Sequence, residues 1–309
     1  MKQAVIDIGS NSMRLTLYEV SGDDFRILFK EKKMAGLAGY VKNGKLSREG
    51  IQCAIIGLLE FKETLRSLGI ENCVVFATAS LRNIVNSKDA ADKISKASGF
   101  EVEILSGRDE ALFGYLGAMR EIQIGSGAFL DIGGASTEIV VFEEAHATES
   151  ISLHMGSLSL YSQCVKKIIP GAGSQKRLQK VIEEVMDDAD EFQFEKEKML
   201  LCVGGTARAV LKLAKKYFAL EEECTKVATG QLRELTAFLC SGRKAATDLI
   251  LKQEADRIHT MIPGLMILCA IVEKFQAEEI IVSRYGVREG YLCQRLINNP
   301  NSVIHKTEN

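Results

Sequence analysis

The chain has 309 residues, of which 46% are hydrophobic and 26% are charged, with 39 basic and 41 acidic side chains. This composition is ample for a packed core and excludes an intrinsically disordered chain. The net charge of −2 argues against a nucleic-acid-binding protein and against a protein of anionic membranes. The longest uncharged apolar run, residues 264–272, is far shorter than the ~20 residues that span a bilayer. We therefore expect a soluble protein of about two domains.

Cysteine and histidine spacing excludes a disulfide scaffold and a zinc enzyme. The eight cysteines form no Cys-x-x-Cys pair. The four histidines, also without metal-ligand spacing, are His146, His154, His259 and His305. Because the N-terminal residues lack the pattern of a signal peptide as well, we expect a cytoplasmic protein with reduced cysteines.

The first third of the chain alternates between extended and helical patterns. Strands are predicted at residues 4–8, 13–20, 25–30, 73–77 and 102–105. Helical periodicity extends over residues 48–68, with an apolar face that includes Leu59 and Leu68, and over residues 89–97. A third helix is predicted to begin near Asp109. This alternation favours an α/β layer fold.

The pattern restarts after a flexible joint at residues 125–127. Further strands are predicted at residues 129–132, 199–203 and 279–283, and helices dominate residues 157–194, 207–217 and 230–254. A final helix covers residues 288–298, and the residues after Pro300 are predicted to fray. We place the first domain at residues 1–120 and the second at 121–309. The final helix, about 288–300, is a candidate to pack back on the first domain.

An internal repeat relates the two halves of the chain. Residues 4–20 align without a gap on residues 128–144. Both segments consist of an apolar strand that ends in Asp-Ile-Gly, a turn of small residues that contains Ser, and a second strand with alternating polarity. A matching hairpin in each half indicates two related domains that face each other across a cleft.

The two repeated turns, Asp7 to Ser12 and Asp131 to Ser136, have the composition of phosphate-binding loops. Glycines allow close approach of the backbone, exposed N–H groups bind anions, and hydroxyls add donors. An Asp at the end of each strand repels phosphate unless a divalent cation, typically Mg²⁺, lies between them. One such turn is weak evidence, because structural turns share its composition. Two turns in register across a duplication favour phosphate binding.

Three other segments have both a structural and a functional interpretation. Residues 204–206 (Gly-Gly-Thr) follow a predicted strand and open a helix, which suits an anion or a ribose, or else a tight turn with Thr206 as the N-cap. Arg82, after the strand at 73–77, is suited to clamp a phosphate or to form a structural ion pair. Glu110, in the first turn of a helix, is either a partner of the helix dipole or a base that activates water.

Four motifs together resemble the exopolyphosphatase/guanosine pentaphosphate phosphatase (Ppx/GppA) family in its short, two-domain form. They are Asp7-Ile-Gly-Ser-Asn-Ser-x-Arg-Leu, Asp131-Ile-Gly-Gly-x-Ser-Thr-Glu, Ser106-Gly-x-x-Glu-Ala and Gly286-Val-Arg-Glu-Gly. The resemblance covers nearly the whole chain. It implies an α/β fold of the actin-like, sugar-kinase and heat-shock ATPase superfamily, which is ribonuclease H-like, with duplicated domains around a central cleft. We expect no additional C-terminal HD-like domain.

The resemblance also implies a role for each matching residue. The catalytic residues are Glu110, which would orient or deprotonate the attacking water, and Asp131, Glu138 and Arg82. The phosphate-binding residues are Asp7, Gly9, Ser10, Asn11, Ser12, Arg14, Gly133, Gly134, Ala135 and Ser136. Ala135 stands where the family often has glycine. A nucleotide or ribose turn is formed by Gly204, Gly205 and Thr206. Mg²⁺, or Mn²⁺ in its place, would be held by Asp131 and Glu138, with Asp7 as a further candidate ligand.

The expected function is that of an exopolyphosphatase, which hydrolyses the terminal phosphoanhydride of inorganic polyphosphate and releases orthophosphate. A pppGpp 5′-phosphohydrolase of the stringent response is the alternative, since both enzymes cleave a terminal phosphoanhydride. An actin-like ATPase, a sugar kinase and a non-catalytic sensor of polyphosphate or alarmone are less favoured. The expected partners are polyphosphate or pppGpp as substrate and, as a candidate assembly, a homodimer. No nucleic acid and no membrane are expected as partners.

Overall fold

The chain forms two α/β units, each built on its own sheet. A computed structural model describes residues 1–189 and 192–297. The first unit comprises Met1–Phe113 and the described residues from Val287 onward, and the second comprises Gly114–Gly286. The division falls between Phe113 and Gly114, earlier than the boundary expected after residue 120. The described residues from Val287 onward group with the first unit, as the candidate packing of the final helix on the first domain allowed, although the range 121–309 includes them.

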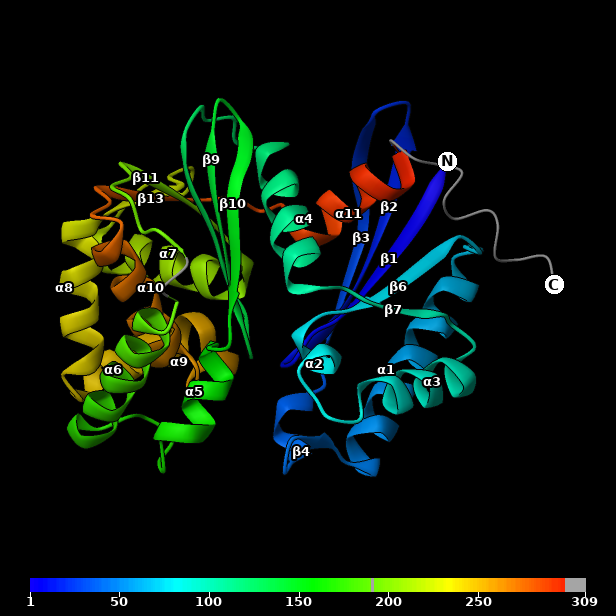
Figure 1. Cartoon of the computed structure of the whole chain (residues 1–309), viewed down its shortest axis with the longest axis horizontal. Helices are drawn as coiled ribbons and strands as arrows, with labels where there is room; N and C mark the ends of the chain where they lie inside the picture. Colours follow the sequence, from blue (N-terminus) through cyan, green and yellow to red (C-terminus); the bar gives the residue numbers. More distant parts are fainter. Residues whose placement is uncertain (190–191, 298–309) are drawn as a thin grey trace. The chain divides into compact units, whose positions relative to one another are not determined.

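The sheet of the first unit has the strand order β3-β2-β1-β6-β7 (Figure 1). Its strands are β1 (Lys2–Ile8), β2 (Ser12–Ser21), β3 (Asp24–Met34), β6 (Cys73–Ala77) and β7 (Val102–Ile104). The first three form an antiparallel meander, whereas β6 runs parallel to β1 and β7 runs parallel to β6. A short ribbon of β4 (Val41–Lys42) and β5 (Lys45–Leu46) follows the 3₁₀ turn η1 (Leu37–Tyr40).

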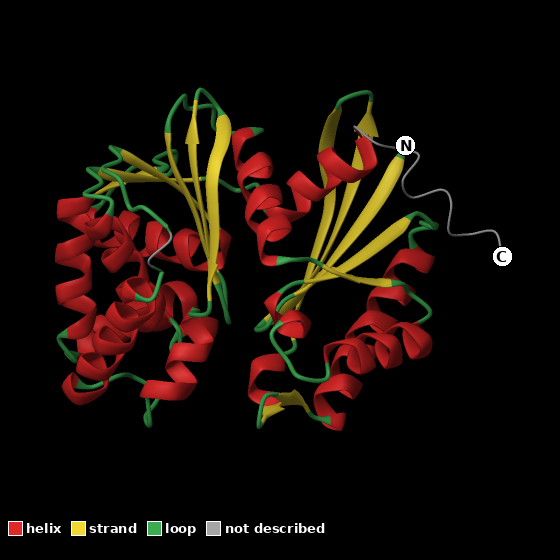
Figure 2. Ribbon diagram, viewed as in Figure 1, coloured by secondary structure: helices red, strands yellow, loops and turns green. Residues whose placement is uncertain are grey.

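Helices cover both faces of this sheet. They are α1 (Arg48–Ser67), α2 (Ala79–Arg82), α3 (Ser87–Ser98), the start of α4 (Gly107–Met119), α11 (Val287–Tyr291) and the π-helical segment η3 (Leu292–Ile297). Helices α1 and α3 pack on the face that carries the hydrophobic core, and α11 lies on the other face (Figures 1 and 2).

Helix α1 begins where the sequence caps it. The Ser47 hydroxyl accepts a hydrogen bond from the Gly50 N–H at 3.3 Å. Glu49 lies in the first turn, where its negative charge interacts favourably with the helix dipole. The apolar face at helical spacing is buried, as predicted, but Leu59 and Leu68 are exposed and do not belong to it. Leu59 follows the buried Leu58 directly, and a rotation of ~100° per residue carries it out of the core face.

The sheet of the second unit has the strand order β10-β9-β8-β11-β13-β12. Its strands are β8 (Gly127–Ile132), β9 (Thr137–Glu143), β10 (His146–Leu153), β11 (Met199–Val203), β12 (Lys226–Ala228) and β13 (Glu279–Val282). Strands β8, β9 and β10 form an antiparallel meander, β11 is parallel to β8, and β13 is parallel to β11. Strand β12 is an added antiparallel edge.

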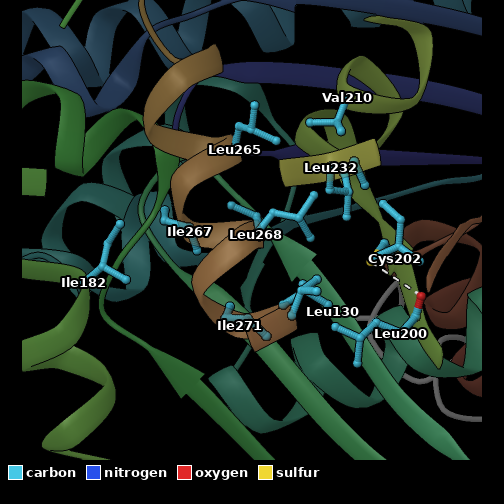
Figure 3. Close-up of a cluster of buried hydrophobic side chains, with 14 of the residues drawn as sticks. Leu130, Ile182, Leu200, Cys202, Val210, Leu232, Leu265, Ile267, Leu268 and Ile271 are labelled. Atoms are coloured by element: carbon cyan, nitrogen blue, oxygen red, sulfur yellow. Dashed lines mark hydrogen bonds between the residues drawn. The ribbon is translucent and has the colours of Figure 1, made fainter. Parts of the chain in front are cut away.

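One large apolar core fills the helical side of the second unit. Its helices are α5 (Ser157–Cys164), α6 (Ala172–Asp187), α7 (Gly204–Phe218), α8 (Thr229–Cys240), α9 (Lys244–Glu254) and α10 (Met261–Lys274), with the 3₁₀ turn η2 (Ala255–Arg257) before α10. Figure 3 shows Leu265, Leu268 and Ile271 of α10 among the side chains of this core. The second half of α4 packs on the opposite face of the sheet, where the Tyr115 ring lies 4.9 Å from that of Phe142.

The two sheets repeat one topology. In each unit an antiparallel meander of three strands is extended by two strands that run parallel to its first strand, in the spatial order 3-2-1-4-5. This order confirms the predicted duplication and the ribonuclease H-like fold of the actin-like superfamily.

Several predicted elements differ in the structure. The helical stretch 157–194 is the two helices α5 and α6, and the stretch 230–254 is α8 and α9. Strand β10 and helix α10 were not predicted. The final helix breaks into α11 and η3 and is described only to Ile297, so the tail after Pro300 lies outside the described residues.

The helices were also compared with the length and hydropathy needed to cross a membrane. Within the described part of the chain, no single helix is long and apolar enough to cross a membrane. One bent pair, Lys244–Arg257 and Met261–Lys274, passes that test by length and composition when its two helices, at 94° to each other, are counted together.

Candidate active site

The first repeated turn closes tightly behind the end of β1. The Gly9 N–H donates to the Ser12 carbonyl at 3.2 Å, and a Cβ at Gly9 would lie only 2.9 Å from that same oxygen. The side chains of Ser10 and Ser12 are buried in the turn. The Ser10 and Asn11 carbonyls accept hydrogen bonds from the backbone of residues 38 and 36. The turn therefore requires glycine at position 9, and hydrogen bonds from residues 36 and 38 stabilise it.

The second turn has the same geometry at the end of β8. The Gly133 N–H donates to the Ser136 carbonyl at 2.9 Å, and a Cβ at Gly133 would lie 3.1 Å from it. The Gly133 and Gly134 carbonyls accept from the first N–H groups of α5. Ala135 does not adopt a positive φ, so the alanine in place of the family's glycine causes no backbone strain.

A buried hydroxyl supports each turn at the same place in the repeat. The Ser80 hydroxyl of α2 donates to the Ile8 carbonyl, and the Thr206 hydroxyl of α7 donates to the Ile132 carbonyl at 2.9 Å. Ile8 and Ile132 occupy equivalent positions of the repeat. Helix α7 begins after Val203 without a side-chain cap, so the interpretation of Thr206 as an N-cap was wrong. Its hydroxyl instead ties the start of α7 to the end of β8.

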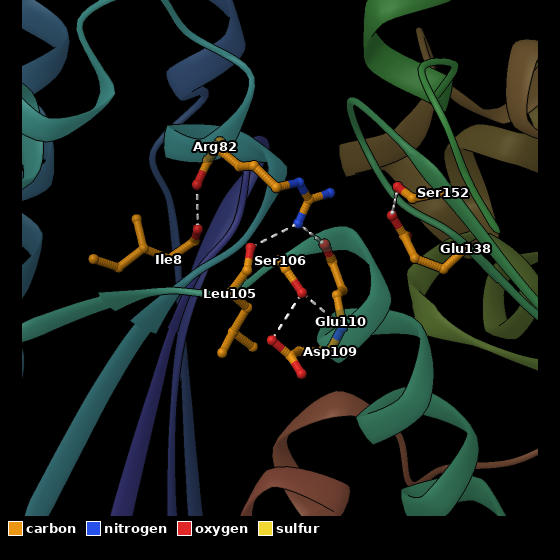
Figure 4. Close-up of polar contacts among 9 residues, drawn as sticks. Ile8, Arg82, Leu105, Ser106, Asp109, Glu110, Glu138 and Ser152 are labelled. Carbon is orange, nitrogen blue, oxygen red and sulfur yellow. Dashed lines mark hydrogen bonds and ion pairs between the residues drawn. The ribbon is translucent and has the colours of Figure 1, made fainter. Parts of the chain in front are cut away.

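Arg82 and Glu110 lie together in the first unit (Figure 4). The Arg82 guanidinium donates to the Glu110 carboxylate at 2.6 Å and to the Leu105 carbonyl at 3.1 Å. Glu110 is in the first turn of α4 and is only 8% exposed. The ion pair that the sequence left as an alternative for Arg82 is therefore formed, and its partner is the candidate catalytic carboxylate.

Asp131, Glu138 and the turn at 204–206 lie together in the second unit. Asp131 is directly opposite Glu138 in the β8–β9 register, so both side chains lie on one face of the sheet. A Cβ at Gly204 would lie 2.1 Å from the Asp131 Oδ1, and Gly204 has a φ of +80°. Only glycine fits there. Glu138 is 1% exposed and accepts a hydrogen bond from the Ser152 hydroxyl at 2.8 Å (Figure 4).

The carboxylate oxygens of Asp131 and Glu138 are suitable ligands for a magnesium ion. Mg²⁺ in enzymes of phosphate chemistry commonly uses one or two protein carboxylates and keeps its other positions for water and substrate oxygens. Two carboxylates on adjacent strands match that requirement. Among residues 1–189 and 192–297, no group of three or more His, Cys, Asp and Glu side chains is placed to hold a metal by itself. The pair therefore suits an ion that substrate phosphate helps to bind.

Asp7 lies among charged groups of its own unit. Burial raises the pKa of the Asp7 carboxyl above its ordinary value, the positive charges of Arg288 and Arg14 oppose this, and Glu289 adds to it. Arg14 is directly opposite Asp7 in the β1–β2 register. Arg288 and Glu289 belong to α11, which groups with the first unit, in line with the expectation that the final helix is a candidate to pack back on the first domain.

Sequence reasoning missed Arg257 of the second unit. Its side chain is 13% exposed and lies 3.9 Å from Glu254. Burial lowers the pKa of its guanidinium, while the negative charges of Glu254, Asp256 and Asp131 raise it. A lone arginine before an apolar helix has no spacing that predicts such a position. Its proximity to Asp131 depends on the turn between α9 and α10.

The predicted residues thus fall into two sets. The first unit holds Asp7 with its turn and Arg14 opposite it, and separately pairs Arg82 with Glu110. The second unit brings together Asp131 with its turn, Glu138 and residues 204–206. Each set contains a glycine turn closed by its own carbonyl and a carboxylate at the end of the first strand. Two ribonuclease H-like units with such turns define a phosphate-handling α/β protein of the actin-like superfamily.

Comparison with known proteins gives the family. The model of the Ppx/GppA phosphatase family matches residues 16–299. A putative exopolyphosphatase from Haemophilus influenzae is 27% identical over 293 residues, which are 94% of this chain and 90% of that protein. A guanosine-5′-triphosphate,3′-diphosphate pyrophosphatase from Aeromonas hydrophila is 28% identical over 307 residues, or 96% of this chain, which spans only 60% of that protein's length.

Solved structures agree on the fold. A Ppx/GppA family member from Aquifex aeolicus superposes with a TM-score of 0.77 at 23% identity, covering 96% of this chain and 98% of that one. An exopolyphosphatase from Cytophaga hutchinsonii superposes with a TM-score of 0.81 at 20% identity, covering 94% and 96%. The chain belongs to the Ppx/GppA phosphatase family, whose members are phosphoanhydride hydrolases.

Proposed function

We propose that this protein is a cytoplasmic, Mg²⁺-dependent exopolyphosphatase that removes the terminal phosphoryl group of inorganic polyphosphate. The observation that carries the proposal is the pair of the half-buried Arg82 and the buried Glu110 in the unit that also holds the first glycine turn. The groups gathered in the two units are hydroxyls, backbone N–H groups, guanidinium and carboxylates, and these recognise phosphate and its counter-ion.

The reaction is phosphoryl transfer to water. Glu110 would orient the attacking water and accept its proton, and Arg82 would hold the Glu110 carboxylate in place through the 2.6 Å contact. The backbone amides and hydroxyls of the turns at Gly9–Ser12 and Gly133–Ser136 would hold the phosphate chain. Asp131 and Glu138 would hold Mg²⁺, or Mn²⁺ in its place, with Asp7 a further candidate ligand; the ion supplies positive charge to the phosphoryl oxygens.

The second candidate is pppGpp 5′-phosphohydrolysis. The relative that supports it is named guanosine-5′-triphosphate,3′-diphosphate pyrophosphatase and is 28% identical to this chain, against 27% for the exopolyphosphatase, but this chain spans only 60% of its length. The start of α7 at residues 204–206, beside Asp131, is where a ribose or an anion would fit.

The test is orthophosphate release from long-chain polyphosphate, short polyphosphate, pppGpp and ATP, each with Mg²⁺ and with EDTA. Glu110→Gln should lower the rate at least about 100-fold, the scale of a lost general base. Asp109→Asn is the matched control, since Asp109 is half-buried, precedes Glu110 and exchanges hydrogen bonds with Ser106 in its own turn. Release from pppGpp alone would favour the alarmone substrate. Equal loss in both variants, or none in Glu110→Gln, would contradict the role of Glu110.

A further inference from the structure

A polar sheet face lies beneath α11 in the first unit. The β1–β2 register places Arg14 opposite Asp7, and alternate side chains of a strand share one face. Thr16 and Tyr18 therefore lie on the same face as Asp7, opposite the face that carries the hydrophobic core. Both are fully buried. Another element of the unit must therefore cover Thr16 and Tyr18 and provide hydrogen-bond partners for their hydroxyls.

Helix α11 supplies both the cover and the partners. The Tyr18 hydroxyl donates to the Glu289 Oε1 at 2.8 Å, and the Arg288 Nη1 donates to the Thr16 hydroxyl at 2.9 Å. Glu289 is as buried as Tyr18. Burial and the adjacent Glu289 carboxylate raise the pKa of Tyr18 well above its ordinary value, so the hydroxyl remains a donor throughout the neutral pH range.

The other side of α11 lies against α4. A Cβ at Gly290 would lie 1.8 Å from the carbonyl oxygen of Phe113, so the two helix backbones are in direct contact. The ring of Tyr291 also packs on that of Phe113, at 5.6 Å. Phe113 is about one helical turn after Glu110. Helix α11 therefore fills the space between the strand that carries Asp7 and the helix that carries Glu110.

The polar contact suits positioning better than it suits stability. Burying a carboxylate and a hydroxyl costs desolvation, and apolar side chains of similar size commonly stabilise such a site as well or better. A directional hydrogen bond, in contrast, fixes how a five-residue helix is rotated on the sheet. At Gly290 a small rotation would press directly on the backbone of α4.

We propose that Glu289 and Tyr18 are positioning residues of the phosphohydrolase: their hydrogen bond fixes α11 and, through the Gly290–Phe113 contact, sets the place of Glu110 relative to Asp7. The inference rests on the function proposed above. Under this inference the Gly286-Val-Arg-Glu-Gly290 motif acts on the reaction by positioning Glu110 and not by contacting substrate.

The experiment compares variants by steady-state phosphate release and by thermal unfolding. Tyr18→Phe removes one oxygen and leaves the ring in place. It should lower kcat about tenfold, with KM within about twofold, at a temperature where every variant is fully folded, because a small displacement of a catalytic group acts on the chemical step. The melting temperature should fall as well, because the buried Glu289 carboxylate loses a donor. Glu289→Gln keeps an oxygen that accepts from Tyr18 and should retain most of kcat, whereas Glu289→Leu should lose at least as much as Tyr18→Phe. Tyr161→Phe, which removes a hydroxyl bonded to the Lys167 carbonyl in the second unit, is the control.

The double variant Tyr18→Phe/Glu289→Leu should lose less than the product of the two single losses, since both single variants remove the same Tyr18–Glu289 hydrogen bond. A Tyr18→Phe protein with wild-type kcat, or one whose kcat falls only as its folded fraction falls, would overturn the inference while leaving the proposed function intact. A wild-type protein that releases no phosphate from any substrate would overturn both. Equal loss in Glu289→Gln and Glu289→Leu would also overturn the inference, because it would make the charge and not the bond the essential feature.

Discussion

Arg82 and Glu110 form an ion pair 2.6 Å long in which the two side chains are 17% and 10% exposed. Twenty-eight residues separate them in sequence. The pair joins the helix after β6 to the first turn of α4. It fixes the direction of a carboxylate that is mostly shielded from solvent.

Removing Arg82 should therefore affect stability and activity together. Arg82→Ala leaves the Glu110 carboxylate buried without its guanidinium, and loss of one partner from a buried pair costs about 3 kcal/mol in the free energy of unfolding. Urea denaturation measures that change. Phosphate release should fall as well, because Glu110 loses its orientation.

Adding Glu110→Gln to Arg82→Ala should recover part of the lost stability, since a neutral amide is less costly to bury than a carboxylate that has lost its guanidinium partner. Arg26→Ala is the matched control, because Arg26 pairs with Glu19 on the exposed surface of the same unit. Such surface pairs contribute about 0–1 kcal/mol. Equal destabilisation in the two alanine variants would show that the Arg82 pair is an ordinary surface contact.

Gly204→Ala should disrupt the second unit's site specifically. The new Cβ would meet Asp131 Oδ1 at 2.1 Å and would require a φ of +80° from alanine. Moving Asp131 aside relieves the clash, so we expect the rate of phosphate release to fall at least about tenfold. Gly230→Ala in α8 is the control, since a Cβ there meets nothing within 4 Å. A Gly204→Ala protein of wild-type activity would remove Asp131 from the reaction.

The carboxylate pair on β8 and β9 predicts a metal requirement that can be titrated. Asp131→Asn and Glu138→Gln should each raise the Mg²⁺ concentration for half-maximal phosphate release at least about tenfold, because each weakens one charged ligand. Glu143→Gln, on the same strand as Glu138 but exposed at its end, should leave the titration unchanged. Variants that lose rate at every Mg²⁺ concentration without any shift of the titration midpoint would contradict a ligand role.

The sequence predicted those parts of the site that are formed by residues close together along the chain. The repeat of residues 4–20 in 128–144 was enough to predict both hairpins, the two glycine turns and the placement of an Asp at the end of each first strand. The position of Glu138 opposite Asp131 follows from the hairpin register. These features involve neighbours along the chain, whose geometry depends on turn chemistry and strand alternation.

The contacts that complete the site join distant segments, and the sequence pattern does not contain them. The Ser80 and Thr206 hydroxyls bond to carbonyls more than 70 residues away. Helix α10 was missed because its residues are buried on nearly every side, which leaves no polar face to reveal the helical period. The sequence left open whether the final helix, with Arg288 and Glu289, packs back on the first domain, because chain order does not determine which unit a terminal helix packs on; the structure groups it with the first unit.

The last prediction concerns the pH dependence of the second unit's stability. Glu121, just after α4, accepts hydrogen bonds from the Ser283 hydroxyl at 2.7 Å, from the Arg284 N–H at 2.6 Å and from the Arg284 guanidinium. Burial alone would raise the pKa of Glu121, but these three donors outweigh it and hold the pKa below the ordinary value of 4.5. The folded state therefore favours the ionised carboxylate. This stabilisation is present above pH 4.5 and is lost as the pH falls through the lower, folded-state pKa.

Glu121→Gln should accordingly destabilise the protein at pH 7, and the difference from wild type should shrink as the pH falls below 4.5. Urea unfolding at a series of pH values measures both. Glu144→Gln, in the exposed turn after β9, should give no such difference at any pH. Because the Glu121 contact joins the end of α4 to the end of β13, a wild-type curve that parallels the Glu121→Gln curve down to pH 3 would show that the three hydrogen bonds do not favour the charged form.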